Sequence, residues 1–265
     1  IPIVFEPGYN ETPEAIAEML EHLSKCTKRN VFAIDCIHGV DRPIGIRRAE
    51  PQVRKAVATL DAMDQVGIAN VDVIGHSEGA VVACAEAQLH PERFRNVVLC
   101  QPAGFKETNV LSFSGGMVLD VTRFAFENVR VLSTEVIQKV RNVLRRMSEP
   151  TTMLDRFGNG LSDPHRSWIA NRRASAERLL SLTTVRQSME RWIGTLQEDL
   201  QKKVILVLGK QDQVHPARTL RKGAKEMGIP DTNIHEFDGH HLSIVDQPER
   251  VAEALAEVLT SSSPV

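Results

Sequence analysis

The stretch from 70 to 83 constrains the fold most. A short β-branched run leads into Gly75-His76-Ser77-Glu78-Gly79, and an alanine-rich segment follows. Gly-x-Ser-x-Gly between a strand and a helix holds a serine out of the sheet on a sharp, strained turn. Glycine suits both flanking positions, because a side chain there would collide with the neighbouring strand or helix. The bare pattern also fits an ordinary turn with an incidental serine, but its flanking elements favour a nucleophile at Ser77.

Strand-like and helix-like segments alternate on both sides of this turn. Short apolar runs typical of buried strands lie at 1–5, 31–36, 70–74, 96–100, 204–208 and 233–237. Alternating strands and helices imply right-handed crossovers and a parallel sheet. We therefore predict an α/β fold with a mostly parallel, doubly wound sheet of about six strands.

These features resemble the α/β-hydrolase superfamily, from residue 1 to about 104 and from about 200 to 260. The resemblance implies a core made of residues 1–104 and 199–265. Residues 105–198 break the alternation, look helical, and by the same resemblance form a cap inserted before the strand that carries the catalytic acid. The superfamily usually has eight strands, with an antiparallel pair before the first strand seen here.

A serine hydroxyl needs a base within hydrogen-bond reach, and the base needs an orienting carboxylate. The resemblance implies the chain order serine, acid, histidine. Asp212 follows the apolar strand at 204–208 and looks like the acid of the superfamily. A loop aspartate that caps the next helix is the structural alternative, and Asp238, Asp155 and Asp163 are competing acids.

The base is predicted from Asp238-Gly239-His240-His241-Leu242, which precedes Pro248-Glu249 at the start of the last helix. This loop resembles the histidine loop of the superfamily, and the residue after glycine fits the family position. We therefore predict His240 as the base and place the adjacent His241 in the substrate pocket. His76 lies inside the serine turn and is expected to point elsewhere, while His38 and His215 lie on loops near the same rim.

An oxyanion formed on the substrate needs two backbone donors. The N–H of Glu78 is one, because it lies at the start of a helix. The superfamily usually has His-Gly after the first strand, where this chain has Pro7-Gly8-Tyr9, so the N–H of Tyr9 is the second predicted donor. Gly8 and Asn10 would border the pocket, together with Trp168 and Phe113 of the insertion, although most large apolar residues are structural.

Composition excludes several other classes. The chain has 265 residues, 42% hydrophobic and 25% charged residues, and a net charge of −2, which argues against a nucleic-acid or anionic-membrane surface. No apolar run reaches the roughly 18 residues that span a bilayer, and no signal peptide is visible at the strand-like start. Four widely spaced cysteines weakly favour a reducing compartment, so we expect a cytoplasmic protein.

The sequence contains no metal-ligand spacing, P-loop or G-x-G-x-x-G motif, so no metal or cofactor is expected. A cluster of Arg42, Arg47 and Arg48 could recognise a carboxylate, although such runs are more often solvated loops.

We therefore expect a serine hydrolase acting on a small carboxylic ester through an acyl-enzyme, as a monomer or a homodimer. Thioester, amide or peptide, and carbon–carbon bond hydrolysis stay open on the same triad. A non-catalytic ligand-binding protein with this fold is the alternative from a different class.

Overall fold

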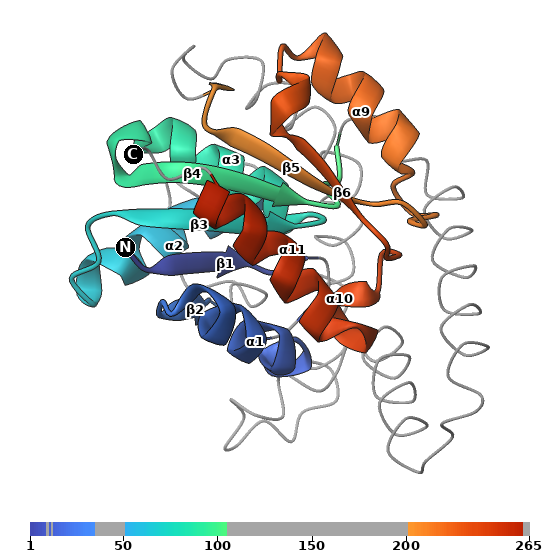
Figure 1. The fold of residues 1–265 in the computed structure, drawn as a ribbon. Helices are drawn as coiled ribbons and strands as arrows, with labels where there is room; N and C mark the ends of the chain where they lie inside the picture. The colour runs from blue at the N-terminus through green and yellow to red at the C-terminus, as the bar shows by residue number, and fades with distance from the viewer. Residues whose placement is uncertain (9–10, 12, 35–50, 105–200, 262–265) are drawn as a thin grey trace, which may run out of the picture.

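The protein is described from a computed structural model, shown in Figure 1, over residues 1–8, 11, 13–34, 51–104 and 201–261. The predicted cap, residues 105–198, lies outside these ranges. The strands are β1 (Ile3–Glu6), β2 (Val31–Ala33), β3 (Val71–His76), β4 (Phe94–Cys100), β5 (Val204–Gly209) and β6 (Ile234–Phe237). The α-helices are α1 (Ala17–Thr27), α2 (Pro51–Gln65), α3 (Gly79–Leu89), α9 (Ala217–Glu226), α10 (Ser243–Asp246) and α11 (Pro248–Ser261). Short 3₁₀ turns are η1 (Pro13–Ala15), η3 (Pro91–Arg93) and η5 (Asp231–Asn233).

The six strands form one sheet in the order β2-β1-β3-β4-β5-β6, and every pair is parallel. Their arrows point the same way in Figure 1. The central strands β3, β4 and β5 are almost entirely buried, as expected of β-branched runs covered on both faces. The predicted α/β class and the six-stranded parallel sheet are confirmed.

Helices cover both faces of the sheet because successive strand residues point to opposite sides. Val4 and Val73 belong to a core shared with α2, α3 and α9. Phe5 and Ile74 belong to the opposite core, shared with α1, α10 and α11. Figure 1 shows α1 and α11 side by side on the second face.

The chain changes direction across the sheet between β1 and β3. From β1 it first passes to β2 on one side, and then returns to form β3 on the other side of β1. In open α/β sheets, ligands bind beyond the carboxyl ends of the strands at such a switch point. The loop after β1 and the serine turn after β3 meet at this point.

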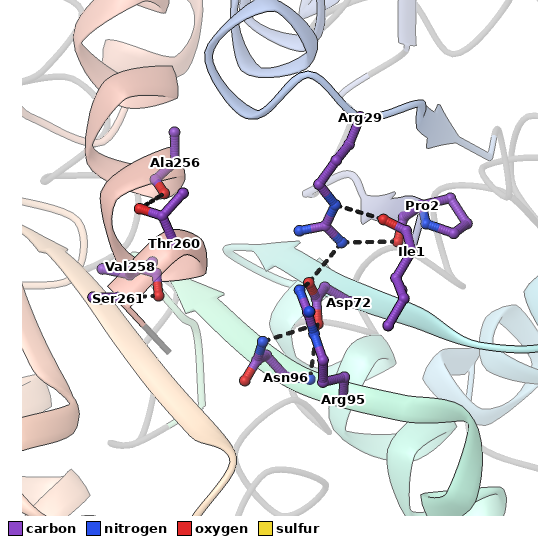
Figure 2. A network of polar contacts seen from close by, with 10 residues as sticks. All are labelled: Ile1, Pro2, Arg29, Asp72, Arg95, Asn96, Ala256, Val258, Thr260 and Ser261. Atoms are coloured by element: carbon purple, nitrogen blue, oxygen red, sulfur yellow. Dashed lines mark hydrogen bonds and ion pairs between the residues drawn. The ribbon is translucent and has the colours of Figure 1, made fainter. Parts of the chain in front are cut away.

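The opposite, amino end of the sheet holds a buried ion-pair network around Asp72 of β3 (Figure 2). Arg95 donates to both carboxylate oxygens of Asp72, and Arg29 lies 2.6 Å from Oδ2. Asn96 adds its backbone N–H and its side-chain amide, at 3.0 and 2.9 Å from Oδ1. Arg29 also donates to the carbonyls of Ile1 and Pro2. The network therefore ties three neighbouring strands together at this end.

Among the described helices, none combines the length and the apolar character needed to cross a bilayer.

Candidate active site

Ser77 occupies the sharp turn between β3 and α3. Its φ of 51° lies in the left-handed region, which is strained for a residue with a side chain. A side chain at Gly75 would collide with the backbone of Ala80, and one at Gly79 with the carbonyl of Glu6. The expected strained turn and the need for both glycines are thus confirmed.

A hydrogen-bonded chain runs from Ser77 through His241 to Asp212. Nε2 of His241 lies 3.2 Å from Oγ of Ser77, and its Nδ1 lies 2.9 Å from Oδ2 of Asp212. An ionised carboxylate can only accept, so Nδ1 carries the hydrogen and Nε2 is left to accept from the serine hydroxyl. All three side chains are buried. The arrangement can remove the proton of the serine as the serine attacks an electrophile.

Asp212 is held on the loop after β5, as the sequence predicted. Its Oδ1 accepts the backbone N–H groups of Val214 and His215 at 2.8 and 2.7 Å. Burial by itself raises the pKa of this carboxyl, but the nearby His241, His215 and these N–H donors outweigh burial. The net pKa lies below its ordinary value. Asp212 is therefore an anion that can stabilise a positive charge on His241.

The contact with Ser77 that we predicted for His240 is made by His241, so the prediction is corrected by one residue. Nε2 of His240 lies 2.8 Å from Oδ2 of Asp246, and its backbone N–H donates to Oγ of Ser243 at 2.8 Å. His240 is thereby bound within its own loop and α10. We predicted His241 as a residue of the substrate pocket. The structure instead places its ring between Ser77 and Asp212.

Two further imidazoles border His241. The ring of His215 meets it edge-on at 5.0 Å, and the ring of His76 lies tilted at 5.0 Å. Burial, and then the proximity of His241, lowers the pKa of His215 to about 3, so this ring stays neutral near neutral pH. His76 lies with its Nδ1 2.6 Å from Oε1 of Glu11. The contacts described for the His76 ring are thus with Glu11 and His241, whereas the serine hydroxyl is contacted by His241.

Glu11, on the loop after β1, was not singled out from the sequence. Its Oε2 accepts the backbone N–H of Gly8 at 2.6 Å, and its other oxygen faces His76. Burial by itself raises the pKa of Glu11. The charge and hydrogen bond of His76, together with the N–H of Gly8, lower it by a larger amount, so the net pKa is below normal. This carboxylate joins the loop after β1 to the serine turn.

The competing acid Asp238 is excluded by position. Its side chain is 64% exposed and lies 3.2 Å from Nζ of Lys210. Asp155, Asp163, His38 and the cluster of Arg42, Arg47 and Arg48 lie outside the described residues.

The family model described as "alpha/beta hydrolase fold" matches residues 1–248. The chain belongs to the α/β-hydrolase fold family. A search of curated protein sequences gives no match.

Solved α/β-hydrolase structures are similar in fold across nearly the whole chain. One is a meta-cleavage product hydrolase from Pseudomonas fluorescens IP01, with 20% identity and a TM-score of 0.62 over 99% of this chain and 91% of that one. Another is a thermophilic esterase from Thermogutta terrifontis, with 17% identity and a TM-score of 0.57 over 100% and 91%. A third is a monoacylglycerol lipase from Paleococcus ferrophilus, with 22% identity and a TM-score of 0.54 over 98% and 94%.

Within this α/β-hydrolase, the predicted oxyanion donors and pocket residues are described only in part. Glu78 lies directly before α3, with its carboxylate bonded to Gln52 and Lys55 of α2 at 3.0 and 3.1 Å. A side chain at Gly8 would press against Glu11 and Ser77, so Gly8 lets the loop approach the serine. Tyr9, Asn10, Trp168 and Phe113 lie outside the described residues. The parts of the α/β-hydrolase that the structure describes contain no cluster of His, Cys, Asp or Glu suited to a metal ion.

Proposed function

We propose that this chain is a serine hydrolase that cleaves carboxylic ester-type small molecules through an acyl-enzyme. Ser77 is the nucleophile, His241 the general base and acid, and Asp212 the orienting carboxylate. The observation that carries the proposal is the unbroken chain of contacts Ser77–His241–Asp212 beyond the carboxyl ends of β3 and β5. The geometry is that of a nucleophile next to a base that a third group orients.

The reaction would run in two halves. As Oγ of Ser77 attacks the ester carbonyl, its proton passes to Nε2 of His241, and Asp212 stabilises the resulting imidazolium. The negative carbonyl oxygen would accept the N–H groups of Glu78 and Tyr9. Collapse of this intermediate expels the alcohol, which takes the proton from His241 and leaves an acyl-serine. Water, deprotonated by His241, then releases the acid and regenerates Ser77.

Ester cleavage is favoured because an alcohol is a better leaving group than an amine, so the reaction needs nothing beyond the triad and two donors. Among the proteins of similar structure, one is an esterase and another a monoacylglycerol lipase. Thioester, amide or peptide, and carbon–carbon cleavage are the alternatives, and a third protein of similar structure is a meta-cleavage product hydrolase. The proposal includes a helical cap at residues 105–198 that supplies the acyl pocket, a cytoplasmic location, and a monomer or homodimer.

The first test is labelling of the protein with a fluorophosphonate, together with hydrolysis of p-nitrophenyl esters of increasing chain length. We expect labelling and ester turnover in the wild type, and neither in Ser77→Ala. The optimum chain length would then size the acyl pocket. A folded wild type that neither reacts with the probe nor cleaves any ester would overturn the proposal in favour of a ligand-binding protein.

The adjacent histidines offer a matched pair of variants. His241→Asn should lower kcat/KM by at least about 10³-fold, because the serine then has no base. His240→Asn changes the same residue type one position earlier, and should affect thermal stability more than turnover. The reverse ranking of the two variants would return the base to His240.

A further inference from the structure

Gln101, directly after β4, contacts Asp212, the side chain proposed as the orienting carboxylate. Its side-chain amide donates from Nε2 to Oδ2 of Asp212 at 3.2 Å. The same oxygen accepts from Nδ1 of His241. Gln101 is fully buried, and its Oε1 has no hydrogen-bond partner within the described residues. Among the polar groups that the structure describes, Asp212 is therefore the one that orients the side-chain amide of Gln101.

The backbone around Gln101 joins the serine turn to the strand that carries Asp212. The carbonyl of Cys100 accepts the N–H of Ser77, and the N–H of Ala103 donates to the carbonyl of Ser77, both at 3.0 Å. The N–H of Gln101 donates to Val207 of β5 at 2.9 Å. One short segment thus holds the serine turn on one side and β5 on the other.

The conformation of Gln101 is strained, and its surroundings are tightly packed. Its φ of 46° lies in the left-handed region. Such a backbone is unfavourable for a residue with a side chain and persists only where the surrounding structure determines it. A side chain at Gly209 would lie 2.5 Å from Nε2 of Gln101, so the amide fills the space beside this glycine. In this conformation the amide reaches Asp212.

We propose that Gln101 is a positioning residue that fixes Asp212 against His241. By donating to Oδ2 of Asp212, it also reduces the negative charge on the oxygen that accepts from His241. This inference rests on the proposed function only for its effect on turnover. A donor on Oδ2 withdraws charge from this oxygen, so Asp212 attracts the proton of the imidazolium less strongly. Without the amide, His241 should hold its proton up to a higher pH, and Asp212 should lose one of its fixed partners.

In the part of the chain that the structure describes, four charged or titratable groups face His241, and they come from three segments. They are Asp212 and His215 on the loop after β5, His76 at the end of β3, and Glu11 on the loop after β1. Substitution of Gln101 leaves all four in place. A change in the titration of His241 would therefore report the lost amide.

The test compares Gln101→Met with Asn96→Leu. Both residues lie on or next to β4, and both donate a side-chain amide to a buried aspartate, but Asn96 does so to Asp72 at the opposite end of the strand. The midpoint of the His241 imidazole titration is measured by NMR in both variants, and kcat/KM is followed against pH. In Gln101→Met we expect the midpoint and the acid limb of kcat/KM to rise by about half a pH unit or more. kcat should fall about tenfold with little change in KM.

Asn96→Leu should lower thermal stability and leave both the midpoint and the pH profile unchanged. Gln101→Glu keeps the size and polarity of the side chain but adds a second carboxylate beside Asp212, so it should raise the midpoint further. The inference is overturned if Gln101→Met titrates as the wild type does, or if Asn96→Leu shifts the midpoint equally. Should Gln101→Met fail to fold, Gln101→Leu, which also lacks the amide and adds no charge, decides in the same way.

The NMR titration needs no turnover, which separates this inference from the proposed function. A wild type that neither hydrolyses esters nor reacts with a fluorophosphonate overturns the proposed function. The response of His241 to Gln101→Met still decides whether the amide positions Asp212.

Discussion

The two ends of the sheet each bury an aspartate, and they neutralise it in different ways. Asp72, at the amino end, is bonded by the guanidinium groups of Arg29 and Arg95 and by Asn96. Asp212, at the carboxyl end, is bonded by two backbone N–H groups, the amide of Gln101 and the imidazole of His241. Arginine stays charged at any ordinary pH, whereas histidine gains and loses its proton near neutrality. The first arrangement can only fix structure, while the second can also take part in proton transfer.

The largest effect that this comparison predicts is on turnover. Asp212→Asn should reduce kcat by about 10³- to 10⁴-fold, because the amide cannot stabilise the imidazolium and favours the wrong tautomer of His241. Steady-state kinetics with the best p-nitrophenyl ester measures the loss, and circular dichroism checks that the variant is folded. A variant that kept a tenth of the wild-type kcat would remove Asp212 from the proposed triad.

The matching change at the amino end should act on stability. Asp72→Asn leaves two arginines without their shared carboxylate, and we expect a loss of about 3 to 5 kcal/mol in the free energy of unfolding. Denaturant titration measures this loss, and the kcat of the folded protein should stay near that of the wild type. A large fall in kcat without a loss of stability would mean that Asp72 affects turnover and does not only fix the structure.

A smaller effect is expected from Arg95→Lys. Lysine keeps the positive charge but cannot bond both oxygens of Asp72 at once, so about 1 to 2 kcal/mol of stability should be lost. Lys222→Ala removes one member of an exposed ion pair with Glu226, and its effect on the denaturant midpoint should be smaller. Equal losses in the two variants would argue against a special role for the bidentate contact.

A third buried acidic site, which is a pair of glutamates, sharpens the comparison, because it is neutralised by retaining a proton. Glu6 of β1 accepts from Thr59 of α2 at 2.8 Å and interacts with the carboxyl group of Glu86 of α3. Burial raises the pKa of Glu6 to about 7, and the bond from Thr59 and the charge of Lys55 only partly oppose this. Burial, and then the charge of Glu6, raises the pKa of Glu86 well above normal.

The smallest predicted effect is the pH dependence of this pair. Below the ordinary glutamate pKa, the folded and unfolded chains both bind the protons, so the pair does not make stability depend on pH there. Between that pKa and about 7, only the folded chain keeps the proton of Glu6, so stability falls as pH rises. Glu86→Gln should therefore gain about 1 kcal/mol, or about 2 to 4 °C in Tm, at pH 8 and nothing at pH 4. A gain of the same size at both pH values, measured by thermal melts, would contradict the retention of a proton by the folded pair.

The sequence was sufficient to predict the sheet, the serine turn and the loop of the acid. Each depends on local patterns: apolar runs of strand length, glycines at two fixed positions, and an aspartate directly after a buried strand. His240 and His241 are adjacent residues of the same type between Gly239 and Leu242, so local pattern does not decide which of them faces Ser77. Asp246 and Ser243 decide between them by binding His240, and the folded loop determines that choice.

Glu11 and Gln101 could not have been found from the sequence for a related reason. Each becomes part of the site only through contacts across the sheet, Glu11 with His76 and Gln101 with Asp212, which is 111 positions away. The positive φ at position 101 could not be predicted from the sequence, because the residue there is glutamine and not glycine or asparagine. Local pattern therefore predicts the elements of the site, and long-range packing selects the partners within it.

The hydrogen bonds from Ser77 to Cys100 and from Ala103 back to Ser77 bear on how this protein can be engineered. Two strained turns on neighbouring strands share these bonds, so a substitution that relaxes one would displace the other. Libraries that randomise 75–80 or 100–103 alone should yield mostly inactive clones. Directed evolution toward a new acyl group should therefore keep both segments fixed and draw its diversity from residues 105–198, the proposed cap.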